Sequence, residues 1–188
     1  MTGRGFSFKE NMKIIYAERY VSPRERPLND EEQEVRRISY ALKAPTFDAI
    51  NIASLALAPL LDSHAYPGAA IVLMPVPSST NSTRVNRIFA NELADQIQAM
   101  SERQVFIRET VIRRHPVESS CVRRRKGLLG LTVEEHAMVR IAGPLCITNT
   151  CFYFVDNVAT TGATLEACQQ ALGFGDGIVY ADQAKRTR

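Results

Sequence analysis

The clearest potential for chemistry lies in one segment of the carboxyl-terminal third of the chain. An apolar run, residues 152–155, is followed by Asp156 and Asn157, by residues 158–159, and then by the series Thr160, Thr161, Gly162, Ala163, Thr164. The apolar run is typical of a buried β-strand, and the threonine and glycine series predicts the start of a helix. Backbone N–H groups and threonine hydroxyls at a helix start can cradle a phosphate. The Asp156 carboxylate would then accept hydrogen bonds from a sugar diol, so the segment predicts a site for a ribose 5-phosphate.

The same segment has a plainer interpretation. It could be an ordinary strand–turn–helix joint, in which a threonine caps the helix and Gly162 supplies the turn. A bare T-x-x-T pattern would favour that interpretation. The complete string from the strand through Thr164 is more specific and favours the phosphate site.

The full string, FYFV-DN-VA-TTGAT, resembles the signature of the type I phosphoribosyltransferases. The resemblance implies that Asp156 and Asn157 are catalytic-site residues that hold the ribose hydroxyls of phosphoribosyl pyrophosphate (PRPP). It also implies that the 5-phosphate is held by Thr160, Thr161, Gly162, Ala163 and Thr164. By the same analogy the cofactor is Mg²⁺, which bridges pyrophosphate and ribose hydroxyls and reaches Asp156 through water.

The chain departs from the family pattern at two positions. The second acidic position holds Asn157, whose amide can hydrogen-bond a hydroxyl but brings no charge to a cationic, oxocarbenium-like transition state. In the 6-oxopurine branch of the family the phosphate loop opens with an aspartate, whereas this chain has Thr160 there. The resemblance therefore disfavours a 6-oxopurine and leaves the acceptor, a nitrogenous base or an amine, unidentified.

A second polar segment follows the apolar run of residues 69–76. In phosphoribosyltransferases the loop at this place holds the pyrophosphate of PRPP, and the resemblance assigns that role to Ser78, Ser79, Thr80 and Arg84. The opening, Met-Pro-Val-Pro at residues 74–77, looks most like the competence-associated branch of the family. Taken alone, a cluster of serine, threonine and asparagine is equally typical of a loop or a helix cap.

Basic residues dominate residues 113–139, where no regular hydrophobic period appears. The segment carries Arg113, Arg114 and the run Arg123, Arg124, Arg125, Lys126. One interpretation is a solvated basic surface. The resemblance implies instead a flexible loop that closes over PRPP, excludes water and uses a cation of the run to neutralise the leaving pyrophosphate. We expect the three histidines, His64, His115 and His136, to be surface or loop residues rather than catalytic bases.

Alternating strands and helices must position these residues. Asn29 followed by Glu32 predicts a capped helix start. Hydrophobic periodicity predicts strands over residues 12–20, 69–76, 104–112, 151–155 and 178–181, and helices over 29–41, 47–61, 84–100 and 165–172.

This alternation predicts an α/β fold with a central, mainly parallel β-sheet flanked by helices. The resemblance adds a fold of the type I phosphoribosyltransferase kind, with a flexible loop and a small hood. Ligands of such sheets bind beyond the carboxyl ends of the strands, where both polar segments would lie. Residues 1–66 would supply a strand and helices, as a hood or a dimer contact. Residues 67–188 would form the core, within one compact domain overall.

Length, charge and cysteine spacing exclude several classes of protein. The 188 residues suit one domain, and a net charge of +3 is too small to indicate a nucleic-acid binder. The four cysteines form no C-x-x-C pair, which argues against a zinc site or a disulfide scaffold. The amino terminus has no apolar leader, and the apolar stretch at residues 50–61 is too short to span a bilayer. We therefore expect a soluble, cytoplasmic protein with no membrane partner.

Three functions are compatible with these features. The first is a Mg²⁺-dependent phosphoribosyltransferase that moves the 5-phosphoribosyl group of PRPP to a base or amine, with a homodimer as the implied assembly. The second is a non-catalytic PRPP or nucleotide sensor that kept the fold, which Asn157 favours. The third is a nucleic-acid-binding accessory protein that uses the basic segment, against which the charge balance argues.

Overall fold

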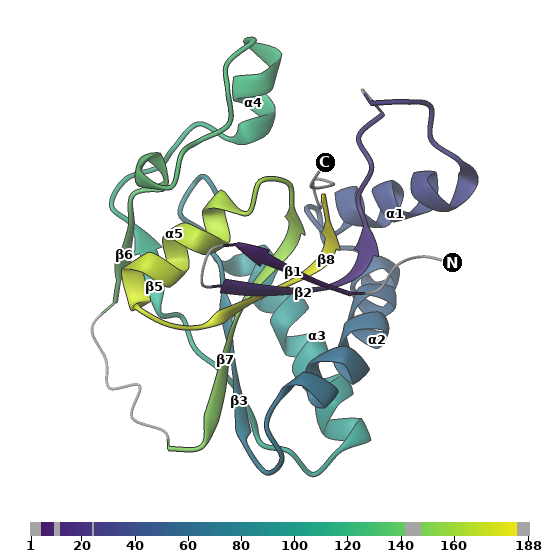
Figure 1. Cartoon of the computed structure of the whole chain (residues 1–188), viewed down its shortest axis with the longest axis vertical. Coiled ribbons are helices and arrows are strands. Elements are labelled where there is room, and N and C mark those ends of the chain that lie inside the picture. Colours follow the sequence, from purple (N-terminus) through teal and green to yellow (C-terminus); the bar gives the residue numbers. More distant parts are fainter. Residues whose placement is uncertain (1–4, 10–11, 24, 142–147, 184–188) are drawn as a thin grey trace.

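The computed structural model describes residues 5–9, 12–23, 25–141 and 148–183 and has an α/β architecture (Figure 1). Within these residues the main sheet has six strands in the order β1-β2-β8-β7-β3-β4. β1 is antiparallel to β2, and every other neighbouring pair is parallel. The strands are β1 (Gly5–Lys9), β2 (Met12–Arg19), β3 (Ala70–Pro75), β4 (Val105–Ile107), β7 (Thr150–Ala159) and β8 (Asp176–Asp182). The expected parallel sheet flanked by helices is confirmed.

Helices cover both faces of the sheet (Figure 1). One face carries α1 (Asp30–Ala41), α2 (Phe47–His64) and α3 (Arg84–Met100), and the other carries α5 (Ala163–Leu172). On the first face Leu57 and Leu93 share an apolar core with Leu73 of β3. On the second face Leu165 shares a core with Met74, the next residue of β3. Successive strand residues point to opposite faces, so β3 contributes to both cores.

Local sequence determines where the helices begin. The side chain of Asn29 accepts a hydrogen bond from the amide of Glu32 at 2.9 Å, and the Glu32 carboxylate accepts one from the amide of Asn29 at 3.1 Å. This reciprocal capping box confirms the expected start of α1. α3 spans the expected residues, whereas α2 continues past residue 61 to His64.

The single strand expected over residues 104–112 is wrong, because these residues belong to two different sheets. Its first part is β4, beside β3. Its second part begins β5 (Val111–Arg113), which pairs antiparallel with β6 (Met138–Arg140). This hairpin carries the short α4 (Ser120–Arg125) and the 3-10 helix η1 (Glu134–His136), and α4 extends beyond the sheet at the top of Figure 1. Local patterning could not reveal the change of partner, because β6 is distant in sequence.

The amino-terminal segment contributes to the same sheet and core as the rest of the chain. β2 pairs with β8, with Ile15 opposite Ile178, and both side chains belong to the core beneath α2 and α3. Cys146 lies outside the described residues, and so do the side chains of Cys121 and Arg124.

Candidate functional site

The two polar segments leave the same edge of the sheet from neighbouring strands. β3 and β7 are parallel, with Pro75 opposite Val155, and the amide of Val76 donates to the carbonyl of Val155 at 3.0 Å. Both loops therefore begin at carboxyl ends of adjacent strands, the place where open α/β sheets bind ligands.

Asp156 lies inside β7 rather than after it, because the strand continues beyond this residue. Its Oδ1 accepts hydrogen bonds from the amide of Asn157 at 2.8 Å and from Nδ2 of Asn86 at 3.3 Å. Burial raises the pKa of the Asp156 carboxyl, while these hydrogen bonds and the positive charges of Lys43 and Arg113 oppose that rise. The group combines a desolvated carboxylate with acceptor capacity suited to ligand hydroxyls.

Asn86, on the buried face of α3, connects the two strands and was not among the expected site residues. Besides its bond to Asp156, its Nδ2 donates to the carbonyl of Val76 at 2.8 Å. A signal for it existed in the sequence. Asn86 shares the buried helical face of Phe89 and Leu93, and a polar residue on such a face indicates a specific partner.

Residues 160–164, called the threonine loop below, connect the end of β7 to the first turn of α5, as expected. Oδ1 of Asn157 accepts a hydrogen bond from the amide of Val158 at 2.9 Å. Gly162 precedes α5 with φ of 76°, a left-handed conformation that favours glycine. The exposed Thr161 accepts from the amide of Ala163 at 3.4 Å. The remaining amides of the first turn lack intrahelical partners and suit an anion.

Hydroxyl groups of the loop after β3 stabilise that loop. Oγ of Ser78 and Oγ1 of Thr80 are 3.0 Å apart, and the amide of Ser82 donates to Ser78 Oγ at 3.2 Å. Asn81 adopts φ of 66° at the turn. Arg84, the first residue of α3, is exposed. The segment is therefore a structured loop next to the threonine loop.

Arg113 is 4% exposed, which corrects its expected place on a solvated or closing basic segment. Its Nε donates to the carbonyl of Ser78 at 2.8 Å, and its Nη2 donates to that of Pro77 at 3.3 Å. Its Nη1 donates to the carbonyl of His136 at 2.8 Å. These bonds compensate the buried charge and fasten the loop after β3 to the base of the β5–β6 hairpin.

His136 was expected at the surface or in a loop; it lies in the connection between β5 and β6 but is buried rather than at the surface. Its Nδ1 lies 3.0 Å from Nη1 of Arg113, and its Nε2 lies 3.4 Å from Oγ1 of Thr164. Because a guanidinium only donates, Nδ1 accepts and the ring proton is on Nε2. Burial, together with the Arg113 charge, lowers the His136 pKa from 6.5 to about 4. A neutral imidazole thus connects the hairpin to the threonine loop.

The expected closing cations occupy α4 and the turn after it. Nη2 of Arg123 lies 3.5 Å from Oε1 of Glu135, and Lys126 pairs with Glu118. Arg125 is exposed. Two of the cations are therefore paired with acids of the same hairpin in this conformation.

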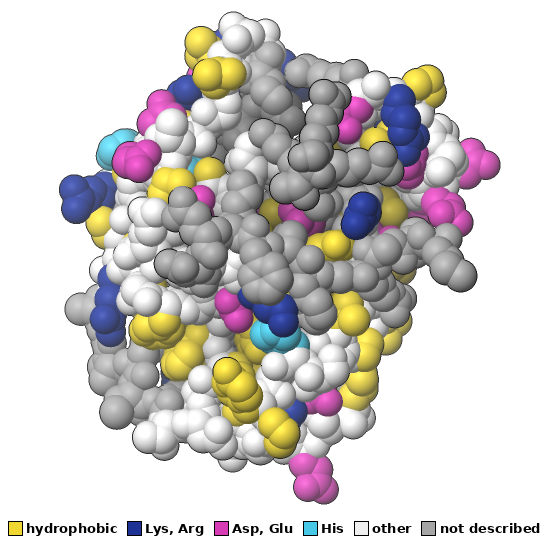
Figure 2. All heavy atoms as spheres, viewed as in Figure 1, with side chains coloured by type: hydrophobic (Ala, Val, Ile, Leu, Met, Phe, Trp, Pro, Cys, Tyr) yellow, Lys and Arg dark blue, Asp and Glu magenta, His cyan; other side chains and the backbone are white. Residues whose placement is uncertain are grey.

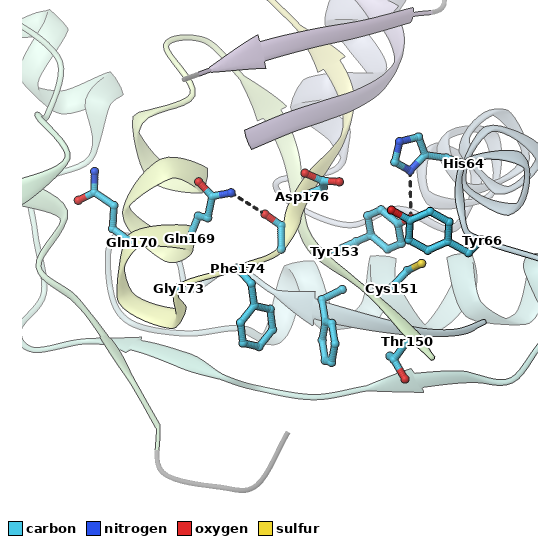
Figure 3. A pocket seen from close by; sticks show the side chains of 12 residues that line it. His64, Tyr66, Thr150, Cys151, Tyr153, Gln169, Gln170, Gly173, Phe174 and Asp176 are labelled. Carbon is cyan, nitrogen blue, oxygen red and sulfur yellow. Dashed lines mark hydrogen bonds between the residues drawn. The ribbon is translucent and has the colours of Figure 1, made fainter. Parts of the chain in front are cut away.

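A cavity of about 720 Å³ lies at the opposite edge of the sheet from these polar loops (Figure 3). It is lined by the ends of α2 and α5 and the starts of β7 and β8, and by none of the expected site residues. His64 lines this cavity as a half-buried residue, and its Nδ1 lies 3.0 Å from the Tyr153 hydroxyl. His115 is exposed, as expected.

On the face drawn in Figure 2, basic and acidic side chains are interspersed. In the described ranges, no group of three or more His, Cys, Asp or Glu side chains is arranged to hold a metal ion. No helix in the same ranges is long and apolar enough to cross a membrane.

No protein-family model matches the sequence, and a search of curated proteins finds no relative.

Proposed function

We propose that this protein is a phosphoribosyltransferase of the type I kind, which transfers the 5-phosphoribosyl group of PRPP to a nitrogenous base or amine. The pairing of β3 with β7 carries the proposal, because it brings two polar loops to the edge of the sheet that holds the Asp156 carboxylate. PRPP has a pyrophosphate and a 5-phosphate at the two ends of a ribose diol. Two polar loops beside a diol acceptor match that arrangement.

In the proposed reaction the C1–O bond to pyrophosphate breaks and a C1–N bond to the acceptor forms. The threonine loop holds the 5-phosphate, and Asp156 orients the diol and stabilises positive charge on the ribose. The half-buried Asp156 carboxylate fits Mg²⁺, which retains waters and uses few protein ligands when phosphates supply the others. Bound Mg²⁺ would neutralise charge on the leaving pyrophosphate.

The β5–β6 hairpin would exclude water from the reaction. Its base is fixed to the loop after β3, since the amide of Val117 donates to the carbonyl of Ser79 at 2.9 Å. Closure requires Arg123 and Lys126 to exchange their glutamate partners for pyrophosphate oxygens. Ion pairs at a protein surface contribute about 0–1 kcal/mol each, so this exchange costs little.

Calorimetric titration of PRPP with Mg²⁺ tests the proposal. We expect wild type to bind, Asp156→Asn to lose at least about tenfold in affinity, and Asp95→Asn to bind like wild type. Asp95 is an exposed carboxylate of α3, so its replacement makes the same chemical change outside the site. Pyrophosphate release is then assayed across nucleobases and amines. Failure of wild type to bind PRPP would refute the proposal.

A second candidate, a non-catalytic PRPP sensor, is favoured by the environment of Asn157. Its side-chain oxygen is used by the amide of Val158, so it offers a ligand only an uncharged amide group. The variant Asn157→Asp separates the two functions. A large gain in pyrophosphate release would identify an enzyme weakened at this position. PRPP binding without release in either form, across the acceptor set, would identify a sensor.

A further inference from the structure

A small cavity of about 130 Å³ lies between α1 and the threonine loop. The threonine loop contributes Thr160 and Thr164 to its lining. The opposite wall comes from Tyr20, which follows β2, from Ser39 in the last turn of α1, and from Lys43, two residues after α1. Sequence patterning gave these three residues no chemical role.

Ser39 supplies the first indication of a ligand. Its residue surface is 2% exposed, and its Oγ has no hydrogen-bond partner among the described residues. A buried hydroxyl without a partner costs about 1–3 kcal/mol. In native proteins such a group nearly always has a partner, which can be a water molecule or a bound ligand, and Ser39 lines a cavity that could hold either.

Lys43 supplies the second indication. Its Nζ lies 5.3 Å from the ring centroid of Tyr40, and its charge lowers the pKa of Asp156. No ion pair of Lys43 with a carboxylate occurs in the part of the chain that the structure describes. The ammonium group is therefore available to an anion at the cavity.

We propose that Lys43, Ser39 and Tyr20 form a subsite, opposite Thr160 and Thr164, for one compact oxyanion. The ammonium and the hydroxyls of Ser39, Thr160 and Thr164 can donate hydrogen bonds to it, and the described lining contains no carboxylate. The Tyr20 hydroxyl is hydrogen-bonded to Tyr40 and closes the cavity beside them. The cavity is about four times the volume of a water molecule in the liquid, which fits one phosphate or carboxylate but not a nucleoside.

The identity of the molecule that carries this oxyanion rests on the proposed function. Two substrates could carry it, because PRPP, the donor, has a 5-phosphate and the acceptor can have a carboxylate. In either case α1 adds a cation to a site that the threonine motif builds from neutral groups. The amino-terminal segment would thereby contribute to ligand selection.

The subsite itself is tested with inorganic phosphate as the probe, followed by ³¹P NMR line broadening. We expect Lys43→Gln to weaken phosphate binding at least about tenfold and Ser39→Ala to weaken it severalfold. The control Lys13→Gln makes the same charge change at the other end of β2 and should leave binding unchanged. Equal phosphate affinity in Lys43→Gln and Lys13→Gln, or no binding by wild type, would overturn the subsite.

Two further titrations identify the source. Parallel loss of phosphate and Mg²⁺–PRPP affinity in Lys43→Gln assigns the subsite to the donor phosphate. The subsite belongs to an acidic acceptor if Lys43→Gln leaves PRPP affinity unchanged. In that case wild type should bind benzoate but not benzamide, and the binding of benzoate should require Lys43. Phosphate binding at Lys43 without any PRPP binding would refute the proposed function alone. PRPP binding with phosphate and benzoate both insensitive to Lys43 would refute the subsite alone.

Discussion

Replacement of His136 by asparagine should flatten the acid dependence of stability. In the folded protein the His136 pKa is lowered from 6.5 to about 4, by burial first and by the Arg113 charge second. The unfolded chain therefore binds a proton on this ring at a higher pH than the folded chain does. The stabilising contribution is complete above about pH 6.5 and is lost as the pH falls to about 4.

The two pKa values determine the size of the effect. They correspond to about 3 kcal/mol of unfolding free energy once the pH is below both, and to about 2 kcal/mol between pH 7 and pH 5. The asparagine side chain retains an acceptor near the Nδ1 position for Arg113 but does not titrate. Other titrating groups are common to both proteins and cancel in the difference.

Urea unfolding followed by circular dichroism at pH 7, 6 and 5 measures this difference. Wild type should lose about 2 kcal/mol more than His136→Asn over that interval. The exposed His115 provides the control, and His115→Asn should follow the wild-type profile. Parallel profiles for wild type and His136→Asn would refute the buried, neutral assignment of this imidazole.

Three other substitutions test the site and its packing. Asn86→Leu should lower the unfolding free energy by about 1–3 kcal/mol in urea unfolding, because Asp156 and the carbonyl after β3 each lose a buried partner. Asp156→Asn should raise the melting temperature at pH 7, because the raised pKa of Asp156 makes its ionised form costly in the folded protein. The gain in stability should disappear below about pH 3.8, and each unit of pKa shift is worth about 1.4 kcal/mol. Gly175→Ala should lower stability by about 1–3 kcal/mol in thermal unfolding, because φ is 104° and the new Cβ would lie 2.9 Å from a ring carbon of Phe154. Gly130→Ala, whose Cβ meets nothing within 4 Å, should match wild type, and a loss there equal to that of Gly175→Ala would contradict the packing argument.

Short-range patterns predicted the main helices, most strands of the main sheet and the threonine loop. The Asn29 capping box, the amphipathic α3 and the glycine before α5 each depend on residues within one or two helical turns. Such signals can be recognised without knowing the fold, because their partners are close in sequence. The alternation of these elements was also sufficient to predict a mainly parallel sheet.

The buried polar connections could not be predicted in this way. Arg113 occurs among many basic residues, and only the folding of β5 against β6 buries it between the loop after β3 and His136. The expectation of a solvated or mobile cation was therefore wrong for this residue. The burial of His136 was missed for the same reason, since its partners are distant in sequence.

The local sequence was enough to propose which segments hold phosphate and diol groups, because backbone amides, threonine hydroxyls and Asp156 express that chemistry locally. The surroundings of these groups emerged with the tertiary structure. Pairing of β3 with β7 brought Asn86 to Asp156, and packing of α1 brought Lys43 to the threonine loop. Burial and long-range charge determine the pKa values and the unpartnered groups of a site, and both depend on contacts that no local pattern encodes.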